Sequence, residues 1–157
     1  MTENRPSSAD PAKAQFLLTH YQSCWQEMSW RRQAGYRTII LGLGYCAALL
    51  VVITFNHTMP PATRYCLAGV IFIATLFGSL YLASNYRKYM QAAGRIVAIE
   101  DFFGAFEPNF LGGSGPLNPA ARRDWPKTPL SRDMVSFWSI LAFAVGGLLT
   151  AAAVVLV

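Results

Sequence analysis

The fold is decided by the stretch TIILGLGYCAALLVVITF, residues 38–55, which contains no Asp, Glu, Lys, Arg or His. The hydrocarbon core of a bilayer is about 30 Å thick, and a helix needs about 20 mostly apolar residues to cross it. Two further stretches have the same character: YCLAGVIFIATLFGSLYLAS, residues 65–84, and MVSFWSILAFAVGGLLTAAAVVLV, residues 134–157. We therefore predict an all-α integral membrane protein with three transmembrane helices.

The composition of the whole chain supports this prediction. Of its 157 residues, 54% are hydrophobic and only 13% are charged, whereas an average soluble domain carries about 25% charge. Three such apolar runs leave too little polar surface to cover them in water, which argues against a soluble domain and against disorder. For the third run, an interfacial or partner-buried helix is the alternative.

The basic residues are distributed unevenly around these runs. Of the 13 Lys and Arg residues, only Arg64 lies in the loop 56–64, and the others precede the first run or separate the second from the third. An excess of Lys and Arg in short loops marks the cytoplasmic side of a membrane. We expect a protein of the bacterial inner (cytoplasmic) membrane, with its N-terminus in the cytoplasm and its C-terminus at the outer face.

Apolar residues outside the spans recur at alternating spacings of three and four, as in the seam of a coiled coil. The pattern predicts a helical hairpin over residues 10–106, whose two helices extend antiparallel into the cytoplasm, turn at Pro60 and Pro61, and end near Gly104. Two amphipathic helices on the membrane surface are the alternative. Residues 1–9 are expected to be flexible. Residues 107–133 are expected to form a Pro/Gly-rich linker with no core, from which Phe110, Leu111 and Trp125 could dock onto the hairpin. The predicted seam residues are Leu18, Tyr21, Trp25, Met28, Tyr89, Ile96, Ile99 and Phe103.

Motifs that carry chemistry are missing from the sequence. It contains no GxGxxG, P-loop, nucleophile elbow or HExxH, so we predict neither an enzyme nor a cofactor. His20, Cys24 and Glu27 share one helical face and are weak candidates for zinc ligands, although a fourth ligand would have to come from elsewhere. We prefer the interpretation that His20 and Glu27 are solvated and that Cys24 packs against a partner helix. His57 and Met59 form an equally weak pair for copper.

The adjacent acids Glu100 and Asp101 do not face each other on a helix and form a poor acid/base pair. We expect them to be solvated and to pair with Arg95 or with an arginine of a neighbouring chain.

Basic residues also cluster at the predicted inner membrane face. We interpret them as a topology signal that attracts anionic lipid, with a phosphate-bearing ligand, RNA or a cytosolic protein as alternative partners. Specific nucleic-acid binding is not expected, because aromatic residues do not interleave the cluster. The cluster comprises Arg31, Arg32, Arg37, Arg87, Lys88 and Arg95.

Small residues spaced four apart in the second and third spans allow helices to approach closely in lipid. Three helices have few internal surfaces, so we expect some of these residues to contact further copies in a homo-oligomer. Thr75 and Ser79 form a mildly polar strip that makes interhelical hydrogen bonds or, as the alternative, lines an opening. The predicted helix-packing and oligomer residues are Ala74, Gly78, Ala142, Gly146, Gly147 and Thr150.

The order of these segments resembles a known group. An amphipathic helix with WQEMSWRRQ, two spans joined by a short outer loop, and a helix continuing as NYRKYMQAAGRIVAIEDFFG resemble the small two-span membrane effectors of bacterial conflict systems, the SLATT-like proteins. The resemblance covers about residues 10–106, rests on architecture and assigns no functional residue. It implies a membrane-perturbing or pore-forming protein of antiviral defence. A non-catalytic accessory subunit, which docks a partner through the cytoplasmic hairpin of a larger membrane complex, is the alternative.

Overall fold

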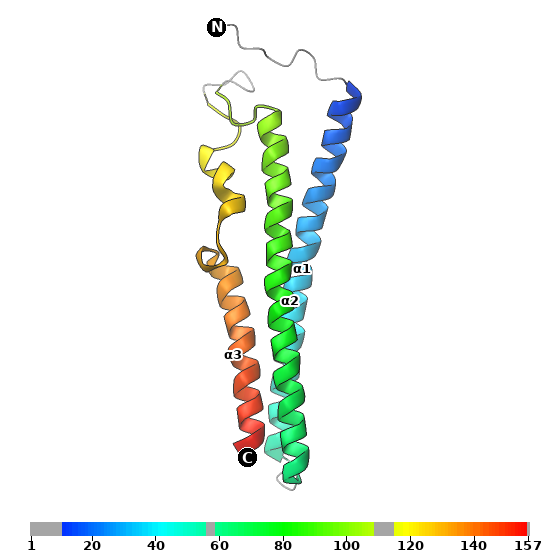
Figure 1. The fold of residues 1–157 in the computed structure, drawn as a ribbon, viewed down its shortest axis with the longest axis vertical. Coiled ribbons are helices and arrows are strands. Elements are labelled where there is room, and N and C mark those ends of the chain that lie inside the picture. The colour runs from blue at the N-terminus through cyan, green and yellow to red at the C-terminus, as the bar shows by residue number, and fades with distance from the viewer. Residues whose placement is uncertain (1–10, 56–58, 109–114, 157) are drawn as a thin grey trace. The chain divides into compact units, whose positions relative to one another are not determined.

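The computed structural model describes residues 11–55, 59–108 and 115–156. Its regular elements are the long α-helices α1 (Pro11–Phe55), α2 (Pro61–Phe102) and α3 (Met134–Leu156), and the short 3-10 helices η1 (Ala120–Lys127) and η2 (Leu130–Arg132) (Figure 1). The described residues contain no strand, which agrees with the predicted all-α class. Each long helix is long and apolar enough to cross a membrane. The predicted flexible segment 1–9 lies outside the described residues.

Proline and glycine set the limits of the first two helices, as the sequence suggests. Pro11 and Pro61 are the first residues of α1 and α2, where proline loses nothing because the first N–H groups of a helix have no internal partner. Gly104, at φ +75°, ends α2. Its N–H donates to the Asp101 carbonyl and the next N–H, of Ala105, donates to the Glu100 carbonyl, a C-terminal cap that requires a left-handed residue.

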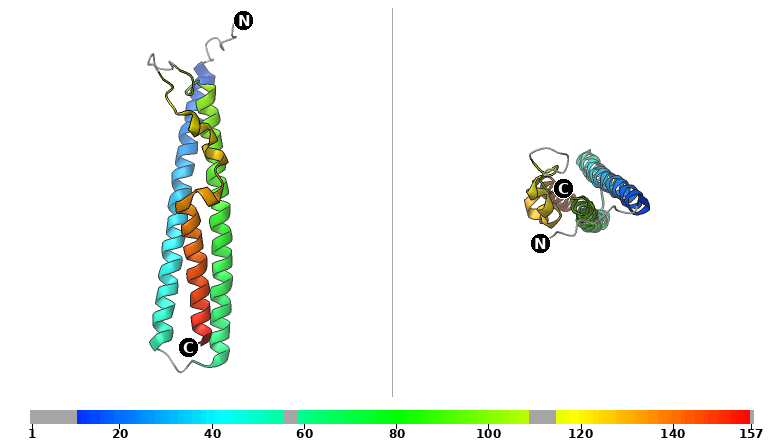
Figure 2. Two further views of the ribbon diagram at one scale, coloured as in Figure 1. Left: turned by 90° about the vertical axis from the view of Figure 1, so that its left-hand side faces the viewer. Right: turned by 90° about the horizontal axis from the view of Figure 1, so that it is seen from above.

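The chain divides into two compact units, and α1 and α2 each contribute to both. Unit 2 comprises Arg31–Lys88 and Thr128–Val157. Within it, α3 lies alongside α1 and α2 (Figure 2). The ring of Phe143 on α3 lies against Gly42 of α1 and Gly78 of α2, where a Cβ atom would overlap it. Two glycines therefore make the space that the ring of Phe143 occupies.

The two ends of α3 are fixed by different contacts. At its start, the side chain of Asp133 accepts hydrogen bonds from the backbone N–H and the hydroxyl of Ser136, which caps the helix. Near its end, Val154 is buried in a cluster with Ile53 of α1 and Ile71 of α2. The end of α3 thus lies beside the end of α1 and the first part of α2 (Figures 1 and 2).

Unit 1 comprises Met1–Trp30 and Tyr89–Lys127. Its core is formed where the first half of α1 packs against the second half of α2. The indole of Trp125, carried by η1, packs against this core, so the segment between α2 and α3 contains a docked element as well as turns. The central cluster of this core consists of Cys24, Met28, Ala92, Ala93 and Ile96, and Ile99 is a further buried residue of unit 1.

Candidate functional site

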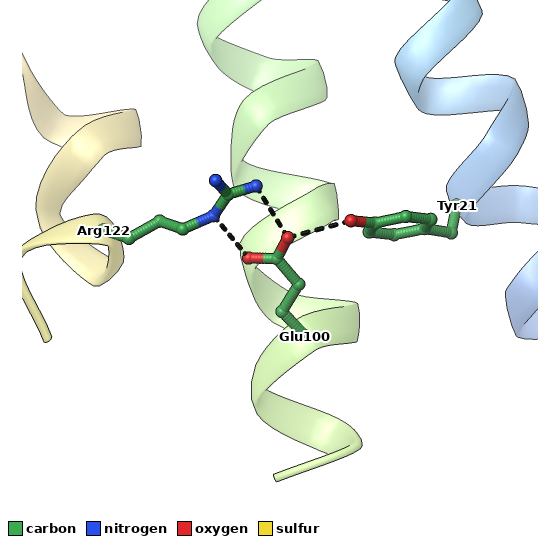
Figure 3. Close-up of polar contacts among 3 residues, drawn as sticks. All are labelled: Tyr21, Glu100 and Arg122. Atoms are coloured by element: carbon green, nitrogen blue, oxygen red, sulfur yellow. Dashed lines mark hydrogen bonds and ion pairs between the residues drawn. The ribbon is translucent and has the colours of Figure 1, made fainter. Parts of the chain in front are cut away.

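The most elaborate polar contact in the described residues is built around Glu100 in unit 1. The residue is only 6% exposed. Its carboxylate accepts two hydrogen bonds from the Arg122 guanidinium, from Nε at 2.8 Å and Nη2 at 2.7 Å. It also accepts one from the Tyr21 hydroxyl at 3.0 Å. The three side chains come from α1, α2 and η1 (Figure 3), so this one carboxylate ties together all three elements of unit 1.

Aromatic rings surround the Arg122 end of this contact. The guanidinium carbon lies 5.8 Å from the ring centroid of Trp25 and 5.5 Å from that of Trp125. The two indoles are 6.5 Å apart, and Trp125 also meets the ring of Tyr89 edge-on at 6.3 Å. A cation within about 6 Å of an aromatic centroid is attracted by the ring. Arg122 is therefore held by a carboxylate and by two indole rings.

The surroundings of Arg122 and Tyr21 favour the protonated form of both side chains. Hydrogen bonding to Glu100 raises the pKa of Arg122 above its usual range, so the guanidinium stays charged. Burial raises the pKa of the Tyr21 phenol, which therefore stays protonated and acts as a donor. Both carboxylate oxygens of Glu100 are thus occupied by donors from the same chain, which suits docking of η1 better than acid/base chemistry.

The expectation for the adjacent acids holds for the solvation of Asp101 but is wrong for the burial of Glu100 and for both arginine partners. Glu100 is buried and pairs with Arg122, and Asp101 pairs with Arg123 at 2.6 Å on the exposed surface. Arg95 instead pairs with Glu27 at 3.6 Å. The reason is that η1 folds back onto α2 and brings two arginines of the same chain to the acids.

The predicted seam residues fall into three groups in the structure. Met28, Ile96 and Ile99 are buried. Tyr21, Tyr89 and Phe103 are half-buried. Leu18 lies on the surface, 56% exposed, and Trp25 is partly exposed. The structure thus brings the middle of the predicted seam together and leaves its start uncovered.

Of the three candidate zinc ligands, Cys24 and His20 lie close together, but Glu27 pairs with a residue outside the set. Cys24 is buried, with its Sγ 3.8 Å from Nε2 of His20, while Glu27 pairs with Arg95. Burial raises the pKa of the Cys24 thiol, which disfavours the thiolate that a metal needs. In the part of the chain that the structure describes, no three His, Cys, Asp or Glu side chains are grouped to hold a metal. The copper candidate His57 lies outside that part.

The basic cluster is divided between the two units. Arg95 belongs to unit 1, and the other five members belong to unit 2. The carbonyl of Arg31 accepts a hydrogen bond from the buried Asn85 at 2.7 Å, and the guanidinium of Arg32 lies over the ring of Tyr36. The remaining members, Arg37, Arg87 and Lys88, are exposed.

Most of the predicted packing residues have partners within the chain. Gly147 lies against the side chain of Thr75, and a Cβ at Gly146 would lie 3.0 Å from Leu43. Thr150 is buried and donates to the carbonyl of Gly146. Gly78 contacts Phe143, as described above.

The remaining members of that set and of the polar strip differ. Ala74 and Ala142 are exposed. Thr75 is buried and donates to the Ile71 carbonyl at 2.8 Å. The Oγ of Ser79 is buried without a hydrogen-bond partner among the described residues. Gly78, Gly146 and Gly147 therefore pack α3 against the other two helices of the same unit.

Of the three residues that the sequence predicts to dock, Trp125 packs on the core of unit 1, and Phe110 and Leu111 lie outside the described residues. The sequence analysis did not predict Arg122 or the burial of Glu100. The signal that could have indicated Arg122 is the sequence RRDW, residues 122–125. It lies within a proline-rich segment that resembles a linker because it has no helical periodicity. Comparison of the chain with protein-family models, curated proteins and solved structures found no match.

Proposed function

We propose that this chain is a non-enzymatic protein of the bacterial inner membrane that assembles with further copies of itself and perturbs the bilayer, as the resemblance to SLATT-like effectors implies. In this proposal α3 and the apolar parts of α1 and α2 cross the membrane. Unit 1 lies in the cytoplasm, on the side where Lys and Arg are concentrated.

The observation that supports the proposed self-assembly is the exposed face of α1. Of the most apolar 18-residue stretch of α1, only 6% is buried inside the chain, whereas 28% of the corresponding stretch of α3 is buried. On this helix Gly44 and Ala48 are exposed one turn apart, and among the described residues no atom lies within 4 Å of a Cβ placed at Gly44. Small residues on an uncovered face allow a second helix to approach closely, which is the main source of packing in lipid.

Tyr45 gives the same face a polar group. It is 55% exposed and lies seven residues into the apolar stretch 38–55. A phenol hydroxyl that faces hydrocarbon has no water to bond to, and polar side chains in spans are commonly satisfied across helices. A second copy packed on Gly44 and Ala48 would supply such partners.

The test is the mass of the full chain in mild detergent, compared between Gly44→Leu and Gly69→Leu. Both glycines are exposed and have nothing within 4 Å of an added Cβ among the described residues, so both variants should fold. We expect a discrete homo-oligomer for the parent and for Gly69→Leu, and monomers for Gly44→Leu. Gly44→Leu should also lose any permeabilisation of dye-loaded vesicles. An unchanged oligomer in Gly44→Leu would exclude this face.

A second candidate, the accessory subunit, is favoured by the exposed start of α1. Phe16 and Leu18 are 69% and 56% exposed in the part assigned here to the cytoplasm, where a partner protein could cover them. A parent chain that is monomeric in detergent would favour this candidate over self-assembly.

A further inference from the structure

The way η1 is held differs from the way the helices of unit 1 are held. η1 has no buried residue of its own and contains Pro126. It is attached through side chains, by Arg122 on Glu100, Arg123 on Asp101, and Trp125 on the core. Elements with few buried apolar contacts open locally at low free-energy cost. The buried cluster of unit 1 consists of residues of α1 and α2 alone, so we expect these helices to remain paired when η1 leaves.

The surface beneath η1 has the properties of a recognition site. It presents a nearly buried carboxylate at Glu100, a hydroxyl at Tyr21 and the rings of Trp25 and Tyr89. In the structure η1 occupies this surface. Its Arg122 donates two hydrogen bonds to the Glu100 carboxylate and lies near the indole of Trp25, and Trp125 follows Arg122 by three residues. Bidentate arginine–carboxylate pairs and buried tryptophans are the contacts that contribute most at protein interfaces.

We propose that the Tyr21–Trp25–Tyr89–Glu100 surface is a docking site for a short segment of a partner protein that carries an arginine followed three residues later by tryptophan. In this structure η1 occupies the site as an internal competitor. A second copy's η1 is the poorer occupant, because each copy already fills its own site at the high effective concentration of an intramolecular contact. A partner segment with no such site of its own has to displace only the η1 of this chain, whereas a second copy's η1 would also have to leave its own site. The inference does not depend on assembly through α1.

Chemical labelling of Cys24 measures whether η1 is docked. It is 2% exposed in the core cluster against which Trp125 packs. With Cys46→Ala and Cys66→Ser as background, Cys24 is the single thiol of the chain, and its rate of labelling by a maleimide reports whether η1 is docked. The double variant Arg122→Ala/Trp125→Ala should label roughly tenfold faster or more than the background protein, at unchanged helix content.

Arg123→Ala is the matched control. It removes the neighbouring ion pair, whose two side chains are both more than half exposed, and it should leave the labelling rate within about twofold because exposed pairs contribute little. If the double variant loses helix content, Arg122→Gln replaces it and should show the same acceleration.

The docking site itself is tested with the peptide PAARRDWPKT, which is residues 119–128 of the chain. Added to the full-length double variant, it should slow the labelling of Cys24 back toward the background rate. The same peptide with Arg122→Ala and Trp125→Ala should not, and Glu100→Gln in the protein should abolish the effect. The proposal is overturned if the double variant labels no faster than the background, or if the intact peptide gives no protection. Protection by both peptides would equally contradict it.

Discussion

At the scale of single residues, Glu100 joins the three elements of unit 1 through its hydrogen bonds to Tyr21 and Arg122. A buried carboxylate is tolerated only when its charge is paired and hydrogen-bonded, and removal of one partner leaves the desolvation cost without compensation. Here Arg122 neutralises the charge and Tyr21 adds a further donor. The contact is therefore a source of specificity for the docked position of η1 as much as of stability.

Tyr21→Phe tests the hydrogen bond to Glu100. The change removes the hydroxyl and keeps the ring, and should lower the free energy of unfolding of the full chain in detergent by about 1–2 kcal/mol near neutral pH. Thermal or denaturant unfolding measures this. Tyr65→Phe, at an exposed position, is the control and should be close to neutral. Equal stability of the two variants would mean that the Tyr21 hydroxyl contributes nothing.

The same variant carries a prediction about pH. Because burial raises the pKa of Tyr21 above its ordinary 10.0, the folded protein holds the phenol proton more tightly than the unfolded chain does. The contribution of this group is therefore complete below pH 10 and is lost as the pH rises above it. Between about pH 8 and about pH 11, the parent should lose more stability than Tyr21→Phe. Identical losses would contradict the assigned cause of the shift.

At the scale of elements, the position of α3 depends on an absence of side chains. Gly42 and Gly78 leave room for the ring of Phe143, and Gly147 leaves room for Thr75. These contacts hold α3 against both other helices of unit 2. Glycine lowers helix stability by about 1 kcal/mol relative to alanine in water, and close packing of this kind is what offsets that cost in a span.

Gly78→Ala should therefore destabilise unit 2. The added methyl would lie 2.6 Å from ring atoms of Phe143, and overpacking of this kind typically costs about 1–3 kcal/mol. Gly69→Ala, on the same helix with open space around it, should be neutral or slightly stabilising. Unfolding in increasing SDS compares the two. Phe143→Leu, added to Gly78→Ala, should restore part of the lost stability. Equal stability of Gly78→Ala and Gly69→Ala would show that the ring of Phe143 lies elsewhere.

At the scale of the whole molecule, the sequence predicts those features that are local along the chain. The apolar runs give the three long helices, Pro61 and Gly104 mark limits of α2, and the three-four spacing finds Met28, Ile96 and Ile99 in the buried core of unit 1. Each of these follows from the order of neighbouring residues within a few turns of helix.

The candidate site could not be found in this way. Arg122 lies 22 residues from Glu100, across a segment whose prolines and glycines give no period from which a contact could be inferred. The small residues of α3 show the second limit. Their spacing indicates close packing, but whether Gly147 and Thr150 face α2 or another chain depends on how three helices turn toward one another.

The proposed topology, with three spans and with unit 1 in the cytoplasm, is tested most directly by a pair of topology reporters. One reporter is inserted within residues 112–115, between α2 and η1, and the other is fused after Val157. The uneven distribution of Lys and Arg predicts that the first reporter is cytoplasmic and the second lies at the outer face. A cytoplasmic position for both reporters would contradict the account, because α3 would then not cross the membrane.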